Sequence, residues 1–277
     1  FVQREIFPKL CMWPCRLLLE KLYVNNRVIW DVDDNIIYNG EISQYEYSLL
    51  LQNASDIIVT SANLSNKILE NAQGKIHKIP TTDGTIYKHV SEEIIHERKQ
   101  RYDSSLRIVW VGTTVNLNEV KRIIPYIEQA AKQIENKRLE LSIVSGIDPH
   151  FASNVIDIKF VRWNRSAVKS ELCDAHVGIM PLKNNEYNTG KGGFKLIQYL
   201  SASLPVIGSA IGINKDIITN EVGFLIENDS EWVEAIVKIA NDELLYNKMS
   251  FSAIKLWHEK YSSEDAGKKI KEIIEAE

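Results

Sequence analysis

A glycine-rich segment with two lysines is the strongest chemical feature of this sequence. Residues 188–195 read Asn-Thr-Gly-Lys-Gly-Gly-Phe-Lys, and the helical pattern Leu-Ile-Gln-Tyr-Leu follows directly. A helix N-terminus offers unpaired backbone N–H groups and the positive end of the helix dipole, which favour a bound anion. Lys191 and Lys195 add positive charge, on one helix face if the helix begins early enough. The segment predicts a phosphate site; a flexible turn with two solvated lysines is the alternative.

A carboxylate cluster closes an expected strand at 28–32. Residues 31–34 read Asp-Val-Asp-Asp, so Asp31 and Asp33 point the same way in an extended chain. Their repulsion raises one pKa unless a cation or a hydrogen-bond donor intervenes. Such a cluster is either a functional site or a set of helix caps. We expect no metal cage, because no histidine or second carboxylate group recurs at ligand spacing.

Two further turns follow expected strands. Gly112-Thr113-Thr114 comes after the strand at 107–111, and the turn at 209–214 comes after the strand at 204–208. Ligands of open parallel sheets lie outside the carboxyl ends of the strands, so both turns suit a phosphate or a sugar. The alternative for each is an ordinary connection between a strand and a helix. Neither the G-x-G-x-x-G of dinucleotide folds nor the G-x-S-x-G of a serine hydrolase is present.

The elements that must position these residues alternate between strands and helices, which predicts an α/β fold. Short runs rich in apolar and β-branched residues predict strands at 28–32, 57–60, 75–79, 107–111, 139–144, 158–160, 177–180 and 204–208. Amphipathic patterns predict helices at 45–52, 64–71, 118–135, 165–173, 194–201 and 230–241, and two more in 243–277, broken near 260–263. Most strand runs are apolar throughout, which favours a parallel sheet covered on both faces.

Composition limits the classes of partner and compartment. The chain has 277 residues, 44% hydrophobic, with 33 Lys and Arg against 37 Asp and Glu. The net charge of −4 implies no nucleic-acid partner. No run approaches the ~20 apolar residues that cross a bilayer, and no signal peptide opens the chain. Three cysteines, at 11, 15 and 173, fit a reducing cytosol better than a disulfide framework or a zinc site.

A turn cluster at 80–84 and a polar, charge-rich segment at 88–103 separate two groups of strands. We therefore expect one domain at 1–82 and a second at 83–260, with a helix at 261–277. The first domain holds about three expected strands, too few for a complete doubly wound sheet. We expect this domain to be incomplete at its front.

The series of motifs resembles a known family over nearly the whole chain from Arg4. Residues 189–208 closely resemble the donor-site signature of retaining GT-B-fold glycosyltransferases of group 1, the family-four class, in the branch with Gly-Lys-x-Gly-Phe-Lys. The strand before the signature, the passages after it and the end of the first domain are similar as well, at 174–182, 211–214, 221–225, 261–262, 54–61 and 78–80. Residues 30–34, Trp-Asp-Val-Asp-Asp, resemble a D-x-D-D passage of one branch.

The resemblance implies two Rossmann-like domains with parallel sheets facing a cleft, and a C-terminal helix that crosses back to the first domain. The second domain then holds a nucleotide-diphosphate sugar, and the first holds a glycan, lipid-linked or protein acceptor. The implied catalytic residues are Asp33, Asp34, Lys191 and Lys195. The implied donor-binding residues are Gly112, Thr113, Arg162, Trp163, Gly192, Gly193, Phe194 and Gln198. Relatives of this class need no metal, because cations and a helix N-terminus neutralise the leaving diphosphate.

The implied activity is transfer of a hexosyl or related sugar with retention, without a cofactor. It belongs to cell-surface polysaccharide synthesis in the cytoplasm, with peripheral association at the inner face of the membrane. Two glutamates of the family are replaced by Gly190 and Gln198, and Val115 to Asn118 stand where an arginine and a lysine are usual, leaving Lys121 or Arg122 displaced. The alternatives are a non-catalytic sugar-nucleotide-binding or scaffold protein and a nucleotide-sugar epimerase.

Overall fold

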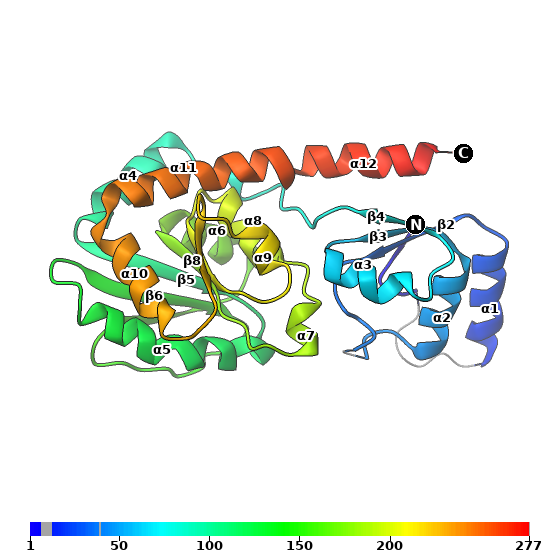
Figure 1. Ribbon diagram of the computed structural model, residues 1–277, viewed down its shortest axis with the longest axis horizontal. Helices are drawn as coiled ribbons and strands as arrows, with labels where there is room; N and C mark the ends of the chain where they lie inside the picture. The colour runs from blue at the N-terminus through cyan, green and yellow to red at the C-terminus, as the bar shows by residue number, and fades with distance from the viewer. Residues whose placement is uncertain (7–12, 39, 277) are drawn as a thin grey trace. The chain divides into compact units, whose positions relative to one another are not determined.

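A computed structural model describes residues 1–6, 13–38 and 40–276 of the chain (Figure 1). The described residues divide into two compact units. Unit 1 comprises residues 1–81, 184–192 and 263–277, and unit 2 comprises residues 82–183 and 193–262. The glycine-rich segment is thus divided, because Gly192 belongs to unit 1 and Gly193 to unit 2. Each unit is built on its own parallel sheet.

Unit 1 has strands in the order β1-β2-β3-β4, as far as the described residues go. The strands are β1 (Val2–Gln3), β2 (Val28–Val32), β3 (Ala54–Val59) and β4 (Lys75–Lys78). The helices are α1 (Trp13–Val24), α2 (Gln44–Asn53), α3 (Ala62–Leu69), α7 (Glu186–Thr189) and α12 (Ser263–Glu275). Ser43 and Ser61 cap α2 and α3, because each hydroxyl accepts a hydrogen bond from the backbone N–H three residues on. The core centres on buried Trp30, Leu50 and Ile57.

Unit 2 has strands in the order β10-β9-β8-β5-β6-β7 within the described part of the chain. The strands are β5 (Ser105–Val111), β6 (Arg138–Ser145), β7 (Asp157–Arg162), β8 (Val177–Met180), β9 (Val206–Ser209) and β10 (Gly223–Ile226). The helices are α4 (Glu92–Tyr102), α5 (Leu117–Ala131), α6 (Arg165–Asp174), α8 (Phe194–Ser201), α9 (Asn214–Ile217), α10 (Glu231–Asn241) and α11 (Glu243–Lys260). Consecutive strands of this order are parallel.

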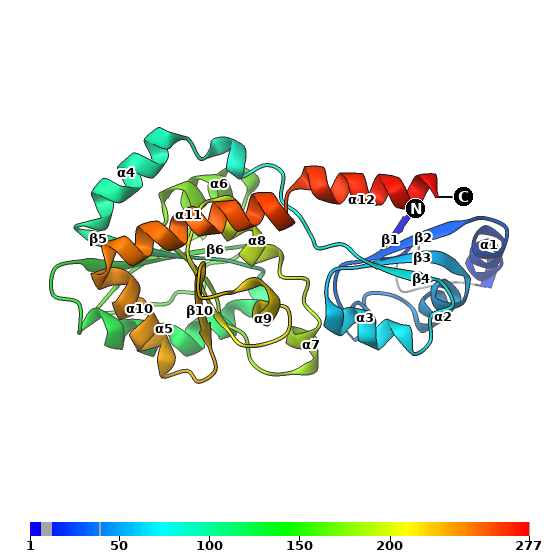
Figure 2. The same ribbon diagram turned by 45° about the horizontal axis from the view of Figure 1, so that its top comes forward.

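Helices cover both faces of the unit 2 sheet, as Figure 2 shows. Alternate residues of β5 explain this: Ile108 and Trp110 pack in one core with α5 and α10. Val109 and Val111 point the other way, into a second core with α6, α8 and α11. Because both faces are covered, the central strands β8 and β9 are buried at every residue, whereas β6 and β7 also carry polar and exposed residues.

The predicted α/β fold with parallel sheets is confirmed, and each predicted strand overlaps an observed one. Among the described residues, the predictions missed strands β1 and β10 and helices α1, α4, α7 and α9. β1 has only two residues, and β10 contains a glycine that a short strand pattern does not favour. Segment 88–103, read only as polar and charged, contains α4, which buries only Arg98 and Tyr102 and shows little apolar periodicity.

The structure also bears on the cysteines and on membrane spans. Cys15 and Cys173 are free thiols in the described part of the chain, and Cys11 lies outside it. Among the described helices, none combines the length and the apolar composition that a bilayer span requires.

Candidate functional site

The strand order of unit 2 creates a natural site at the carboxyl ends of β5 and β8. These strands are neighbours, with Ile108 opposite Val177, but the chain continues from β5 to β6 on one side and from β8 to β9 on the other. Loops that leave in opposite directions open a crevice at such a switch point. The Gly112 turn follows β5, and residues 181–193 lead from β8 to α8. The donor site expected in unit 2 thus corresponds to the edge where parallel sheets bind ligands.

The Gly112 turn is shaped by close packing. The Gly112 N–H donates to the carbonyl oxygen of Val144 at 3.0 Å. A Cβ at position 112 would lie 2.3 Å from the Trp110 ring, so only glycine fits without a shift. Asn116 Nδ2 donates to Thr113 Oγ1 at 2.7 Å, while the Thr113 residue stays exposed. The turn therefore presents Thr113 at the switch point on a fixed backbone.

The N-terminus of α8 lies at the same edge. Gly193 is the N-cap with φ +76°, and no side-chain hydrogen bond caps the helix within the described residues. Only glycine adopts this φ without strain, and a Cβ would lie 2.7 Å from Ile217. Phe194 is exposed and Lys195 is half-buried. The first turn of α8 thus has backbone N–H groups that no side-chain cap satisfies within the described residues.

The condition under which both lysines would share one helix face, a helix that begins before Lys191, is not met. α8 begins at Phe194, so Lys195 is in its first turn and Lys191 precedes the helix in the loop. Lys191 is buried, with 7% exposed, and its Nζ lies 4.6 Å from the centroid of the Tyr187 ring. This cation–π contact holds the ammonium in unit 1. The two lysines therefore belong to different units.

Gly192 packs against the carboxyl end of β2 in unit 1. Its N–H donates to Asp34 Oδ1 at 2.9 Å, and a Cβ there would lie 2.5 Å from the Asp33 carbonyl oxygen. Thr60 Oγ1 donates to that same carbonyl oxygen at 2.9 Å. The Gly192 amide, expected to bind donor phosphate, thus has an acceptor inside the protein. Asp33, Asp34 and Gly192 are brought together as neighbours at one sheet edge.

Arg4 forms ion pairs with the acidic cluster, and no pattern in the sequence had indicated this residue. Its guanidinium contacts Asp33 at 2.8 Å, Glu41 at 2.7 Å and Asp34 at 3.3 Å. The short strand β1 would have indicated Arg4. It pairs Gln3 with Asp31, so the next residue, Arg4, lies beside the cluster. Burial and the charge of Asp33 raise the pKa of Asp31 to about 6, although Arg4 opposes this. The pKa of one carboxyl was expected to rise through repulsion unless a cation intervened; Arg4 does intervene, and burial rather than repulsion is the main cause of the rise at Asp31.

Gln198 is bound to a buried carboxylate of its own unit. Its Nε2 donates to Asp83 Oδ2 at 2.9 Å. Asp83 Oδ1 accepts hydrogen bonds from the backbone N–H groups of Thr85 and Ile86 at 2.8 and 3.1 Å. Burial raises the pKa of Asp83, but these hydrogen bonds together hold it below its ordinary value. An amide at position 198 is thus suited to a neighbour that a glutamate would repel.

The carboxyl ends of β6 and β7 carry the remaining predicted residues. The Trp163 N–H donates to the Ser145 carbonyl oxygen at 2.8 Å, and its side chain is 51% exposed. Arg162 is exposed and donates to the Gly146 carbonyl oxygen at 3.4 Å. A flat exposed indole fixed at the end of a strand offers a stacking surface for an aromatic ring.

Arg122 of α5 reaches the loop after β8. It donates to the Leu182 carbonyl oxygen at 3.1 Å and forms an ion pair with Asp229. The arginine and lysine that relatives carry after the Gly112 turn are absent here, and Lys121 or Arg122 were the candidates to replace them. The side chain of Arg122 is at the switch point, whereas Lys121 is exposed, with Nζ 6.0 Å from the centroid of the Phe151 ring. No metal-binding group of three His, Cys, Asp or Glu occurs among the described residues.

Comparison with known proteins relates the segment around this site to a family. Residues 105–242 match the family described as glycosyl transferases group 1. No curated protein sequence matches the chain.

Solved structures share the fold at low sequence identity. Sucrose-phosphate synthase from Thermosynechococcus elongatus is 16% identical with a TM-score of 0.65, over 89% of this chain and 66% of its own. HepE of Anabaena, in complex with UDP and glucose, is 13% identical with a TM-score of 0.68, over 96% and 76%. WaaG, a glycosyltransferase involved in lipopolysaccharide biosynthesis, is 13% identical with a TM-score of 0.64, over 90% and 75%. The expected GT-B type of α/β fold is thereby confirmed.

Proposed function

We propose that this chain is the larger part of a retaining glycosyltransferase that moves a sugar from a nucleotide-diphosphate donor to a glycan or lipid-linked acceptor. The carrying observation is the carboxyl edge of unit 2. There Thr113, Trp163 and the first turn of α8 lie within the segment that matches the glycosyl transferase group 1 family. The complex of HepE with UDP and glucose supports a nucleotide-sugar donor. A role in cell-surface polysaccharide synthesis, at the cytoplasmic face of the membrane, is part of the proposal.

The proposed reaction breaks the bond between the anomeric carbon and the diphosphate oxygen. The electron pair of that bond leaves on the nucleoside diphosphate, and the acceptor hydroxyl oxygen bonds to the anomeric carbon. The hydroxyl proton is carried away by the departing diphosphate. In this proposal Lys195 and the α8 N-terminus stabilise the charge that develops on the leaving oxygen. The same cations remove the need for a metal ion.

Asp33, Asp34 and Lys191 are proposed to act from unit 1. The cluster already holds a cation, because Arg4 forms ion pairs with Asp33 and Asp34. Asp31, with a pKa raised to about 6, is the member of the cluster that can exchange a proton near neutral pH. We propose Asp34 as the side chain closest to the acceptor, because it also contacts the glycine-rich segment.

Calorimetric titration with UDP tests the donor site directly. Lys195→Ala is expected to weaken UDP binding by about 10- to 100-fold, which is ~1.5–3 kcal/mol for a lost charge-assisted hydrogen bond. Lys195 is a better probe than Lys191, whose burial makes substitution affect folding as well. Lys248→Ala, which removes an exposed lysine of α11, is the matched control. Equal UDP affinity of the Lys195 variant and the control would contradict the proposal.

A non-catalytic sugar-nucleotide-binding protein is the second candidate, favoured by one observation. Position 198 carries an amide that is held by Asp83, where the family's signature has a carboxylate. Release of sugar from UDP-sugars in the presence of acceptor separates the two candidates. Tight UDP binding without release supports the scaffold. Turnover of the donor without any acceptor supports an epimerase instead.

A further inference from the structure

Unit 1 contains a cavity of about 470 Å³ that no step of the donor reaction uses. It lies at the carboxyl end of β2, between α2 and α3. Its lining comprises Val32, Asp34, Asn35, Ile36, Ile37, Tyr38, Tyr47, Leu64, Asn66, Lys67, Ile68, Glu70 and Glu186. This volume lies within the range of small-molecule sites in proteins, roughly 300–1,000 Å³.

The floor of the cavity is apolar and rigidly built. Leu64 and Ile68 stand one turn apart on α3 and are buried, with 2% and 1% exposed. Tyr47 of α2 packs edge-to-face on Trp30, with ring centroids 5.6 Å apart, which fixes its ring beside the cavity. Tyr38, 53% exposed, adds a second aromatic ring at the rim. A ligand with flat apolar faces is suited to such a floor.

The rim of the cavity is rich in hydrogen-bonding groups. Asp34 and Asn35 come from the loop after β2, and Asn66 is an exposed residue of α3. At one side of the cavity, Lys67 of α3 forms an ion pair with Glu186 of α7 at 3.3 Å. This pair links two segments that are far apart in the sequence. Amide and carboxylate groups of this kind recognise hydroxyl groups. Apolar faces with hydroxyl edges are the chemistry of a sugar ring.

The charges of the lining favour an uncharged ligand. Three carboxylates, Asp34, Glu70 and Glu186, line the cavity against one lysine. Lys67 already contacts Glu186, and Asp34 contacts Arg4, which does not line the cavity. A phosphate or carboxylate brought close to these side chains would be repelled. The cavity is therefore electrostatically unlike a diphosphate site.

We propose that this cavity binds the acceptor of the transfer through an uncharged sugar residue. The inference rests on the proposed function, because an acceptor exists only if the protein transfers a sugar. It adds the class of the acceptor, since the sugar residue beside Asp34 carries neither phosphate nor carboxylate. Asp34 belongs both to the cavity and to the contact with Gly192, so it connects the acceptor pocket with the glycine-rich segment.

Saturation-transfer NMR with uncharged methyl glycosides tests this proposal. The probes are the methyl glycosides of glucose, galactose, mannose and N-acetylglucosamine, each paired with its 6-phosphate. We expect at least one uncharged glycoside to bind, and its 6-phosphate to bind at least fivefold more weakly. Tyr38→Ala, at an exposed position, is expected to weaken the uncharged glycoside at least fivefold. Binding of no uncharged glycoside, or preference for the phosphates, would overturn the inference.

Charge reversal tests the electrostatic part in the opposite direction. Glu70→Lys is expected to improve binding of the 6-phosphate at least threefold, and Glu264→Lys, at an exposed position of α12, is the matched control. An equal response of both variants counts against the inference. UDP titration of the same wild-type sample keeps the two proposals apart. UDP binding without glycoside binding leaves the proposed donor site standing and removes the acceptor cavity, whereas the reverse result removes the donor site and with it the acceptor role, and leaves only a sugar-binding cavity.

Discussion

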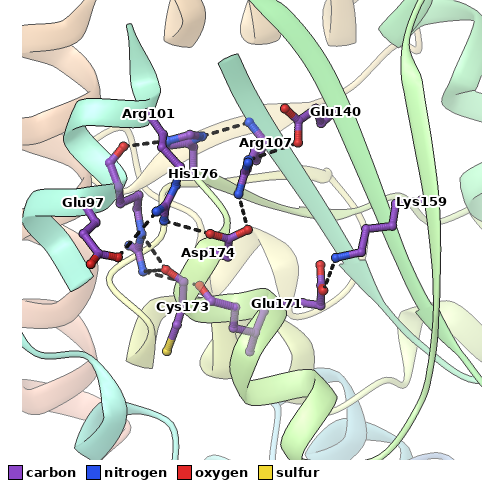
Figure 3. Close-up of polar contacts among 11 residues, drawn as sticks. Glu97, Arg101, Arg107, Glu140, Lys159, Glu171, Cys173, Asp174 and His176 are labelled. Carbon is purple, nitrogen blue, oxygen red and sulfur yellow. Dashed lines mark hydrogen bonds and ion pairs between the residues drawn. The ribbon is translucent and has the colours of Figure 1, made fainter. Parts of the chain in front are cut away.

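The two edges of the unit 2 sheet use polar groups in opposite ways. At the amino edge, Arg101 and Arg107 both contact Asp174, and Arg107 also contacts Glu140 at 3.0 Å (Figure 3). His176 is buried there, with Nδ1 accepting from the Arg107 N–H at 2.9 Å and Nε2 donating to the Arg98 carbonyl oxygen at 2.9 Å. At the carboxyl edge, glycine turns and exposed side chains face outward.

Arg98 shows why the amino edge is structural. Its guanidinium is 1% exposed and donates to carbonyl oxygens at the ends of α6 and α8, which are those of Leu172, Cys173, Ala202 and Ser203. The last carbonyl groups of a helix lack partners and carry the negative end of its dipole. One cation therefore completes two helices. The comparison teaches that dense charge alone does not mark a site, because the fold itself satisfies these groups.

Of the changes that test this comparison of the two edges, Arg98→Ala is expected to cause the largest loss in the free energy of unfolding. The substitution leaves buried carbonyl groups of two helices without a donor, at a cost of roughly 3–5 kcal/mol in the free energy of unfolding. Urea denaturation measures this loss. The matched control is Arg162→Ala at the carboxyl edge, where the side chain is exposed and the expected change is within about 0.5 kcal/mol. Similar losses for both arginines would remove the distinction between the edges.

His176 gives the amino edge a pH dependence. Burial is the main reason that the pKa of His176 falls to about 3, so the folded protein holds it neutral. The unfolded chain binds this proton below about pH 6.5. The stability that His176 contributes is therefore present above pH 6.5 and lost as the pH falls toward 3. Between pH 6.5 and pH 4 we expect a loss of roughly 2–3 kcal/mol, smaller than the Arg98 effect.

The difference in unfolding free energy between wild type and His176→Gln isolates this contribution. Glutamine can accept and donate hydrogen bonds but does not titrate. The advantage of the wild type should therefore shrink as the pH falls, when both proteins are denatured by urea across this range. A difference that stays constant with pH would show that the histidine is not held neutral.

The sequence predicted the unit 2 framework well because its signals are local. β8 has no polar side chain and β5 is apolar from Ile108 to Val111, and α8 was predicted with its observed bounds, Phe194–Ser201. Both follow from periodicity within a few residues. The structure adds the reason for glycine at 112 and 193, since packing or a positive φ excludes a side chain at each position.

Long-range pairing could not be predicted. Arg4 meets Asp33 across 29 positions, Arg98 meets Ala202 across 104, and Gln198 meets Asp83 across 115. No local pattern encodes such partners, because they arise only when strands and helices pack. The division of the glycine-rich segment between the two units, which separates Lys191 from Lys195, is likewise a result of packing. The roles assigned to the donor-binding residues stay predictions.

Gln198→Glu probes a partnership at the carboxyl side of unit 2. A glutamate there places a second carboxylate against buried Asp83, and we expect a loss of about 1–2 kcal/mol in unfolding free energy at pH 7. The penalty should vanish below about pH 4, where one carboxyl group takes up a proton. Adding Asp83→Asn should recover most of the loss, and urea denaturation of the four proteins forms a double-mutant cycle. Additive effects would show that the two positions do not interact.

Trp163→Ala has the smallest expected effect and sharpens the comparison most, because it touches binding and not folding. The exposed indole is proposed to stack on the donor base, a contact worth about 1 kcal/mol, so UDP affinity should fall about fivefold. Affinity for inorganic pyrophosphate, which has no base, should not change. Phe251→Ala, another exposed aromatic on α11, is the control. Equal weakening of UDP and pyrophosphate binding by Trp163→Ala would show that the indole stabilises the loop and does not stack on the base. The indole would then have a structural role, like the charged groups of the amino edge.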